Sequence, residues 1–180
     1  MVSPSELIQQ LDKLPVEDEH VDGYRRAKFG FYKDADHNQC DARKEVVIAE
    51  AMDLMMNTYN CNIRSGKWFS PFDAATMTGP DSLAVTHLVS LRETWESGAW
   101  QWDEPTRNAY LNDLKHPETM LVVSPASVTD RADRDPGGWM PSNEAYRCDY
   151  LKAWVYLKTL YKLSVDPGER EAIAAAALHC

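Results

Sequence analysis

The chain has 180 residues, of which 44% are hydrophobic, and this is enough for one domain with its own core. Its 28 acidic residues exceed its 19 basic ones and leave a formal charge of −9, so the average surface repels phosphate and disfavours nucleic acid as a partner. No apolar run reaches the roughly 18 to 20 residues of a membrane span, so we expect no membrane partner, while the oligomeric state stays open.

The N-terminus, MVSPSELIQQL, lacks the basic start and the apolar core of a signal peptide, so we expect a cytoplasmic protein. A signal peptide ahead of the printed sequence would make secretion the alternative. The four cysteines are too widely spaced for a paired-cysteine metal site. They could form two disulfides, Cys40–Cys61 and Cys148–Cys180, each worth about 3 to 4 kcal/mol. Four free buried thiols in a reducing cytoplasm are the alternative.

Helix-start signals and apolar spacing predict the elements of the first half. Asp41 is a preferred N-cap residue, and the segment ARKEVVIAEAMDLMM that follows it has apolar side chains at helical spacing. Ser65 and Gly66 form a turn signal between two short apolar runs. The predicted elements are a helix over 4–14, an irregular segment over 15–41 with a helical turn near Tyr24–Phe29, a helix over 42–56 and a hairpin over 61–72.

The second half alternates short strands with helices. LAVTHLVSL (83–91) and MLVVS (120–124) are strand candidates, the second between polar loops. Gly98 closes a short helix, Pro105 starts another, and Asp166 caps the last one. The predicted helices cover 92–98, 105–114, 143–163 and 167–180. A helix-rich chain with a few short strands belongs to the α+β class.

An ordered series of landmarks runs through most of the chain. These are Cys40-Asp-Ala-Arg43, Gly66-Lys-Trp68, His87 in its strand, Trp95-Glu-Ser-Gly98, Asp133-Arg-Asp135-Pro136, Arg147-Cys148-Asp-Tyr150 and Cys180. Together they resemble the HNH endonuclease family proteins of actinobacteria, which are related to the C-terminal domain of the GmrSD-type restriction enzymes. The resemblance covers residues 24–180 and implies a helix-rich HNH-like domain around a ββα-metal core. Residues 1–23 would then be an appended N-terminal helix and polar loop.

The resemblance also implies a nuclease site, which this chain does not keep intact. In the family the strand ends in Asp-His: the aspartate holds a divalent metal, the histidine deprotonates water, and an asparagine after the second strand is another ligand. This chain keeps His87 but has Thr86 and Val128 at the two ligand positions. A hydroxyl is a poor ligand for a hard cation, and valine is none. We therefore predict no metal and no cofactor, with Mg²⁺ or Mn²⁺ as the alternative if Asp81 or Asp130 replaces a ligand.

These residues predict a bacterial enzyme that acts on a small molecule without a metal. His87 would be the general base or acid, because an imidazole with a pKa near 6.5 suits proton transfer in a cyclisation, isomerisation or elimination of a biosynthetic pathway. Thr86 and Asn112 would orient the substrate. The predicted substrate-binding residues are Trp100 and Trp102, which could wall an apolar pocket, and Arg131, at the family's lysine position.

Two other functions remain open at this point. One is an active Mg²⁺- or Mn²⁺-dependent HNH endonuclease with a relocated ligand. The other is a non-catalytic binding protein, in which His87 is a core histidine bonded to a backbone carbonyl.

Overall fold

The fold is that of a computed structural model, which describes residues 4–57 and 59–180. Its elements are of mixed type, and the α+β prediction is confirmed. The helices are α1 (Pro4–Leu11), α2 (Ala42–Ala49), α3 (Leu91–Glu96), α4 (Glu104–Leu111), α5 (Pro125–Arg131), α6 (Arg147–Leu160) and α7 (Pro167–Ala177). Short 3₁₀ turns cover Arg26–Phe29, Pro80–Ser82, Ala99–Gln101 and Glu144–Tyr146. None of the described helices is long and apolar enough to cross a bilayer.

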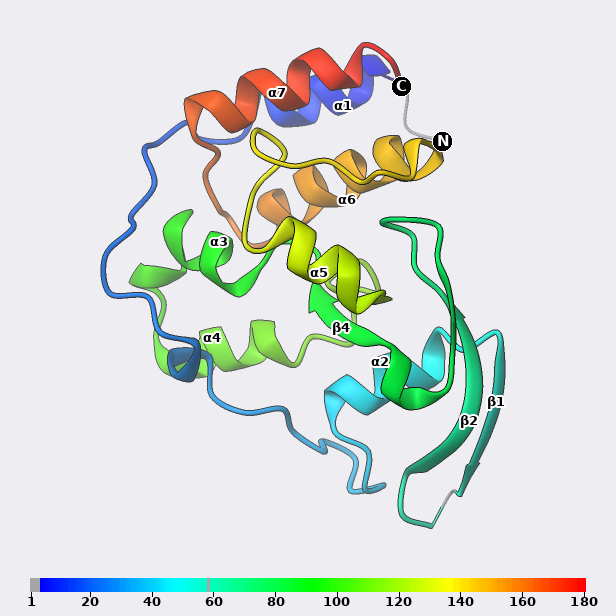
Figure 1. The fold of residues 1–180 in the computed structure, drawn as a ribbon. Helices are drawn as coiled ribbons and strands as arrows, with labels where there is room; N and C mark the ends of the chain where they lie inside the picture. The colour runs from blue at the N-terminus through cyan, green and yellow to red at the C-terminus, as the bar shows by residue number, and fades with distance from the viewer. Residues whose placement is uncertain (1–3, 58) are drawn as a thin grey trace.

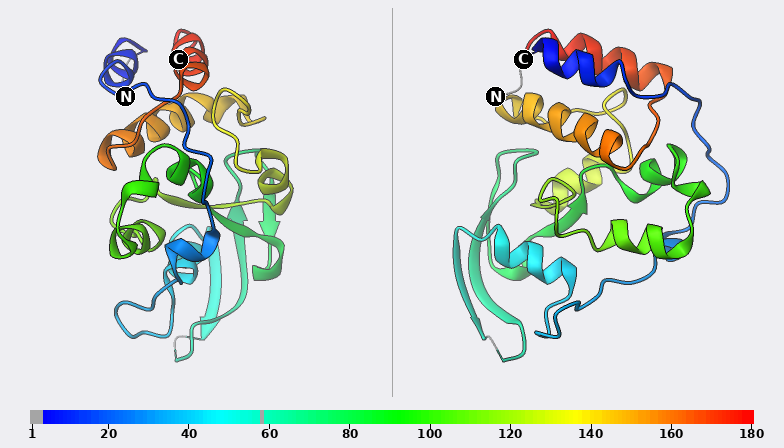
Figure 2. Two further views of the ribbon diagram at one scale, coloured as in Figure 1. Left: turned by 90° about the vertical axis from the view of Figure 1, so that its left-hand side faces the viewer. Right: turned by 180° about the vertical axis from the view of Figure 1, so that it is seen from behind.

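Two separate antiparallel sheets hold the strands. The larger has the order β1 (Asp53–Asn57), β2 (Asn62–Phe69), β3 (Thr76–Thr78), and the smaller pairs β4 (Ala84–His87) with β5 (Met120–Val123). The helices α1, α6 and α7 lie together at one end of the molecule, and β1 and β2 lie away from them (Figures 1 and 2). Helix α5 follows β5 directly and packs against β4 near the centre. The chain therefore contains a strand–strand–helix unit, with α3 and α4 inserted between its two strands.

The predicted helix over 42–56 is wrong beyond Ala49. Residues 53–57 form β1 instead, and the Met52 amide donates to the Lys67 carbonyl at 2.8 Å. An apolar run of this kind fits a helix face or a half-buried strand, and pairing with β2 decides between them.

The hairpin predicted over 61–72 is also wrong, because Ser65 and Gly66 lie inside β2 and pair with β1. Gly66 is needed there for packing: a Cβ atom would lie 2.2 Å from the Trp68 ring. The glycine marks a close approach of an indole to the backbone and not a turn.

Most other elements appear where the sequence predicts them. The short turn over Arg26–Phe29 and α6 lie within the predicted segments, and Asp166 caps α7 in a capping box with Glu169. Helices α3 and α4 each begin one residue before the predicted segment, and the strand predicted over 83–91 ends at His87. Helix α5 was not predicted, although Ser124 is a good N-cap residue and Pro125 follows it. The division of the chain at residue 23 stays a prediction. In the structure Leu7 and Leu11 of α1 are fully buried in the same core as α6 and α7.

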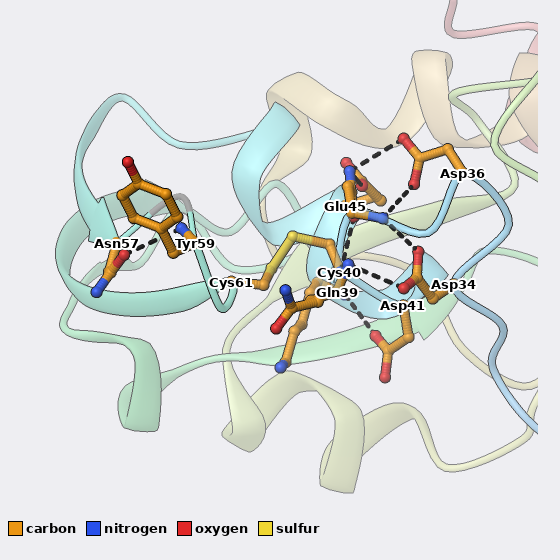
Figure 3. Close-up of a disulfide and its surroundings, with 11 residues drawn as sticks. Asp34, Asp36, Gln39, Cys40, Asp41, Glu45, Asn57, Tyr59 and Cys61 are labelled. Carbon is orange, nitrogen blue, oxygen red and sulfur yellow. Dashed lines mark hydrogen bonds between the residues drawn. A yellow bond between two sulfur atoms is a disulfide. The ribbon is translucent and has the colours of Figure 1, made fainter.

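Of the two alternatives for the cysteines, the structure shows the two disulfides. Cys40–Cys61 joins the loop before α2 to the start of β2, and Cys148–Cys180 joins the first turn of α6 to the end of the chain, with Cα–Cα distances of 5.3 and 5.5 Å. Figure 3 shows the first disulfide beside a polar loop, in which the Asp34 carboxylate accepts from the backbone amides of Asn38 and Gln39 at 3.0 and 2.8 Å. The first disulfide therefore ties the polar loop before α2 to the larger sheet.

Candidate functional site

A pocket of about 190 Å³, open to solvent, lies at the contact between β4 and α5. Thr86 and His87 line it from the end of β4, and Val128 and Arg131 line it from α5. The antiparallel register pairs Ala84, at the start of β4, with Val123, two residues before α5. Helix α5 therefore begins near the start of β4, and Arg131 in its last turn reaches the end of that strand. Residues more than forty positions apart in the sequence thus meet at one site.

Arg131 holds a buried positive charge in this pocket. Its side chain is 1% exposed, and its Nη1 donates to the carbonyl oxygens of His87 at 3.1 Å and Leu88 at 2.9 Å. Its Nη2 donates to the Thr86 hydroxyl at 2.8 Å, and the guanidinium lies 5.3 Å from the centre of the Phe72 ring. Among the described residues no carboxylate pairs with it. Burial lowers the pKa of Arg131, but a guanidinium starts so high that it stays charged.

This charge bears on the metal question. The guanidinium touches the hydroxyl of Thr86, the residue at the position of the family's metal-binding aspartate. A divalent cation about 4 Å away would be repelled by roughly 8 kcal/mol at an effective dielectric constant of about 20. The arrangement therefore opposes a metal at Thr86.

His87 is held as a neutral ring. It is 4% exposed, and its Nε2 lies 3.2 Å from the Leu111 carbonyl oxygen. A carbonyl can only accept, so Nε2 carries the hydrogen and the lone pair lies on Nδ1. Burial lowers the pKa of His87 to about 4, below the ordinary value assumed from sequence. At neutral pH the ring can therefore accept a proton but has almost no protonated form to donate one.

Asn112 does not line this pocket. Its Oδ1 accepts from the Lys33 amide at 2.7 Å, and its Nδ2 donates to the Phe31 and Asn108 carbonyls at 3.1 and 2.9 Å. The side chain clamps the segment before α2 onto the end of α4. The hydrogen bonds of the Asn112 side chain are thus made to backbone atoms of Phe31, Lys33 and Asn108, outside the pocket.

The two predicted tryptophans also lie elsewhere. Trp100 is 41% exposed and stacks on His20, with ring centres 4.1 Å apart. Trp102 packs edge-on against Tyr110 and near Tyr161. The structure thus brings Thr86, His87 and Arg131 together and leaves the other three predicted residues outside.

The two carboxylates considered as replacement ligands are not at the pocket. Asp130 accepts from the Trp139 indole at 2.7 Å, and Asp81 lines a different hollow with Arg43 and Lys44. Asp133 does line the pocket, but it is half exposed and lies 3.9 Å from Arg92.

No family model and no solved structure matches the chain. One curated protein, described as an uncharacterized secreted protein of the fungus Arthroderma benhamiae, is 31% identical over 159 residues. The matched region covers 88% of this chain and 76% of the relative. The chain belongs to the family of this fungal secreted protein. The cytoplasmic prediction gains no support from a family whose named member is described as secreted, and membership leaves the HNH resemblance untested.

This chain also has a second group of ionisable side chains, which the sequence analysis did not predict. Lys158, fully buried, bonds to Glu93 at 2.6 Å and Glu169 at 2.8 Å. Carboxylate oxygens of Asp135 and Asp166 lie within 4.8 Å of Glu169. Among the residues that the structure describes, these carboxylates could hold a cation, but the Lys158 ammonium already pairs with Glu93 and Glu169. The sequence feature that could have indicated this group is Lys158, a lysine on the apolar face of the helix predicted over 143–163.

Proposed function

We propose that this chain is a secreted protein with an HNH-like strand–strand–helix frame that works without a metal. A small organic molecule would enter the pocket beside His87. The neutral ring would take a proton from it at Nδ1 and return it to another atom, as in an isomerisation or cyclisation. Thr86 would orient the substrate, and Arg131 would supply the positive charge of the site.

The contact of Arg131 with Thr86 carries this proposal. It places a permanent cation beside the hydroxyl, and the two Nη atoms of that cation donate to Thr86 and to the backbone oxygens of His87 and Leu88. A site that already contains a bonded cation has no electrostatic need for a second one. The pocket of about 190 Å³ is below the usual range for drug-sized ligands, so the substrate, or the part of it that enters, is small.

Secretion rests on two observations. The relative is described as secreted, and all four cysteines are paired in disulfides. Disulfides persist in oxidising surroundings and are rare in a reducing cytoplasm.

A metal titration tests the proposal. Calorimetry with MnCl₂ should show no binding to the protein, and plasmid DNA incubated with Mg²⁺ or Mn²⁺ should stay intact with or without EDTA. The triple variant Thr86→Asp, Val128→Asn, Arg131→Lys restores the residues of the resembling family and should bind Mn²⁺. The double variant that keeps Arg131 should bind Mn²⁺ more weakly, because the bonds of the guanidinium to His87 and Leu88 hold it beside position 86, whereas a lysine lacks this fork and can turn away.

Two outcomes would count against the proposal. Cleavage that EDTA abolishes and His87→Ala removes would favour the metal-dependent endonuclease. A triple variant that folds but binds no Mn²⁺ would argue against the HNH-like frame.

A non-catalytic binding protein is the second candidate. The nearly complete burial of His87 and its bond to Leu111 favour it. In the unaltered protein, the ¹⁵N NMR signals of the His87 ring should report a neutral Nε2–H form at neutral pH. Small-molecule fragments that reach the pocket should shift the Nδ1 signal, and if none does, the non-catalytic reading prevails.

A further inference from the structure

Two hollows meet at Glu50, on a part of the surface that shares no lining residue with the pocket of His87. The larger, about 490 Å³, lies between the end of β2, β5 and α6, and the smaller, about 240 Å³, lies beside α2. Glu50 and Pro117 line both. We call the two together the Glu50 groove; its lining residues are Glu45, Val46, Ala49, Glu50, Phe69, Pro71, Leu88, Asp113, Leu114, His116, Pro117, Glu118, Met120, Leu121, Tyr146 and Ala153.

The groove is mainly apolar. Phe69 and Leu114 are more than two-fifths exposed to solvent, and Leu121 and Met120 form the buried floor. Apolar side chains left open to water beside a hollow are typical of surfaces that bind a ligand. The larger hollow alone is within the usual size range of small-molecule sites.

Glu50 is fixed at the junction. It lies just after the end of α2, and its Oε2 accepts from the Val122 amide at the open edge of β5 at 2.8 Å. Within the described residues Oε1 accepts no hydrogen bond. Burial raises the pKa of Glu50 to about 7, which indicates a carboxylate that gains from a cationic partner.

The charges around the groove have one sign. Glu45, Asp113 and Glu118 line it in addition to Glu50, and no lysine or arginine among the residues the structure describes does so. The groove would thus repel an anion and attract a cation.

His116 adds a hydrogen-bonding group. Its Nδ1 lies 2.8 Å from Oδ2 of Asp113, which also accepts from Thr119 at 2.8 Å and from the Tyr161 hydroxyl. These hydrogen bonds lower the pKa of Asp113 although its burial opposes them, so the carboxylate is ionised. The imidazole is therefore held in one orientation, and its Nε2 has no partner among the described residues.

We propose that the Glu50 groove binds a small organic cation, an ammonium or amidinium group carried on an apolar body. The charged group would pair with Oε1 of Glu50 and approach Nε2 of His116. The apolar body would lie against Phe69, Leu121 and Ala153. Charge complementarity selects this class of ligand over neutral or anionic molecules of the same shape.

The test uses 2-phenylethylammonium as the probe, with phenylacetate and 2-phenylethanol as matched anionic and neutral compounds. Titrations followed by the methyl signals of Met120, Leu121 and Ala153 should show saturable binding of the cation, and at least tenfold weaker binding of the other two. Binding should strengthen as pH rises from 6 to 8, because burial raises the pKa of Glu50 to about 7 and its carboxyl loses its proton in that range.

Variants separate the carboxylate from the apolar hollow. Glu50→Gln should weaken binding at least tenfold, and it still offers an oxygen to the Val122 amide, so the fold is kept. Glu171→Gln, an exposed carboxylate on α7, should change binding less than twofold. Ala153→Phe should abolish binding by filling the larger hollow with Glu50 intact. No saturable binding to the unaltered protein, equal binding of phenylacetate, or full binding by Glu50→Gln would each overturn the proposal and leave the proposed function of the His87 pocket untouched.

Discussion

Lys158 has no contact with water, and its ammonium lies between the carboxylates of Glu93 and Glu169. Burial alone would lower its pKa, but the two ion pairs raise it, so the charge is kept. Lys158→Met would leave two buried carboxylates without their cation and should lower the free energy of unfolding by about 3 to 5 kcal/mol. Urea denaturation would measure this loss.

A matched control lies on the same helix. Lys152 pairs with Asp149 at 3.5 Å, and Asp149 is mostly exposed. Lys152→Met should change the free energy of unfolding by less than about 1 kcal/mol, since water screens such pairs. Equal losses for both variants would show that the buried triad is not held by its charges.

Residue identity predicted only part of the candidate site. The position of His87 in a strand could be predicted from the apolar run around it, but the choice between two disulfides and four free thiols could not be made from the sequence. The burial of Arg131 could not be predicted, because nothing near it in the sequence predicts the carbonyl oxygens of β4 that it meets. Asn112 was misjudged for the same reason, since its partners Phe31 and Lys33 are distant in the chain.

At the scale of elements, terminal signals were more informative than apolar spacing. Asp41 and Asp166 do cap α2 and α7, since each side chain accepts from backbone amides of the first turn. The end of α2 could not be predicted, because the methionines over residues 52–56 fit either a helix or a strand. The hydrogen bonds of β2 make the choice, and those depend on long-range pairing.

The cap of α7 gives an element-scale prediction. The Asp166 side chain accepts from the Gly168 and Glu169 amides, and Asp166→Ala should lower the free energy of unfolding by about 1 kcal/mol. Asp166→Asn keeps the acceptor and removes the charge near Asp135 and Glu19, so it should be nearly neutral. Thermal unfolding of the two variants side by side measures the cap apart from the charge, and a loss in Asp166→Asn as large as in Asp166→Ala would contradict a role in capping.

For the whole molecule, burial of ionisable groups sets how stability depends on pH. Burial raises the pKa of Glu50 to about 7. A raised carboxyl pKa contributes stability that is full below about 4.5 and is lost as pH rises through 7. His87, with its pKa lowered to about 4, contributes in the opposite sense: its stability is present above 6.5 and is lost as pH falls toward 4.

Above pH 6.5 the contribution of His87 is complete while Glu50 still loses its proton, so the unfolding temperature should be higher at pH 6.5 than at pH 7.5 at constant ionic strength. Calorimetry at both values measures this directly. Glu50→Gln should reduce the difference, because the amide does not titrate. A higher unfolding temperature at pH 7.5 would mean that other groups control the balance.

The guanidinium of Arg131 is joined to its helix by covalent bonds and to β4 by hydrogen bonds. A bound ion exchanges with the medium, so its occupancy follows the surroundings. The positive charge at the end of β4 cannot dissociate, be exchanged for another cation or be removed by a chelator. The charge of this site is therefore fixed when the chain folds and does not depend on the concentration of metal ions around the protein.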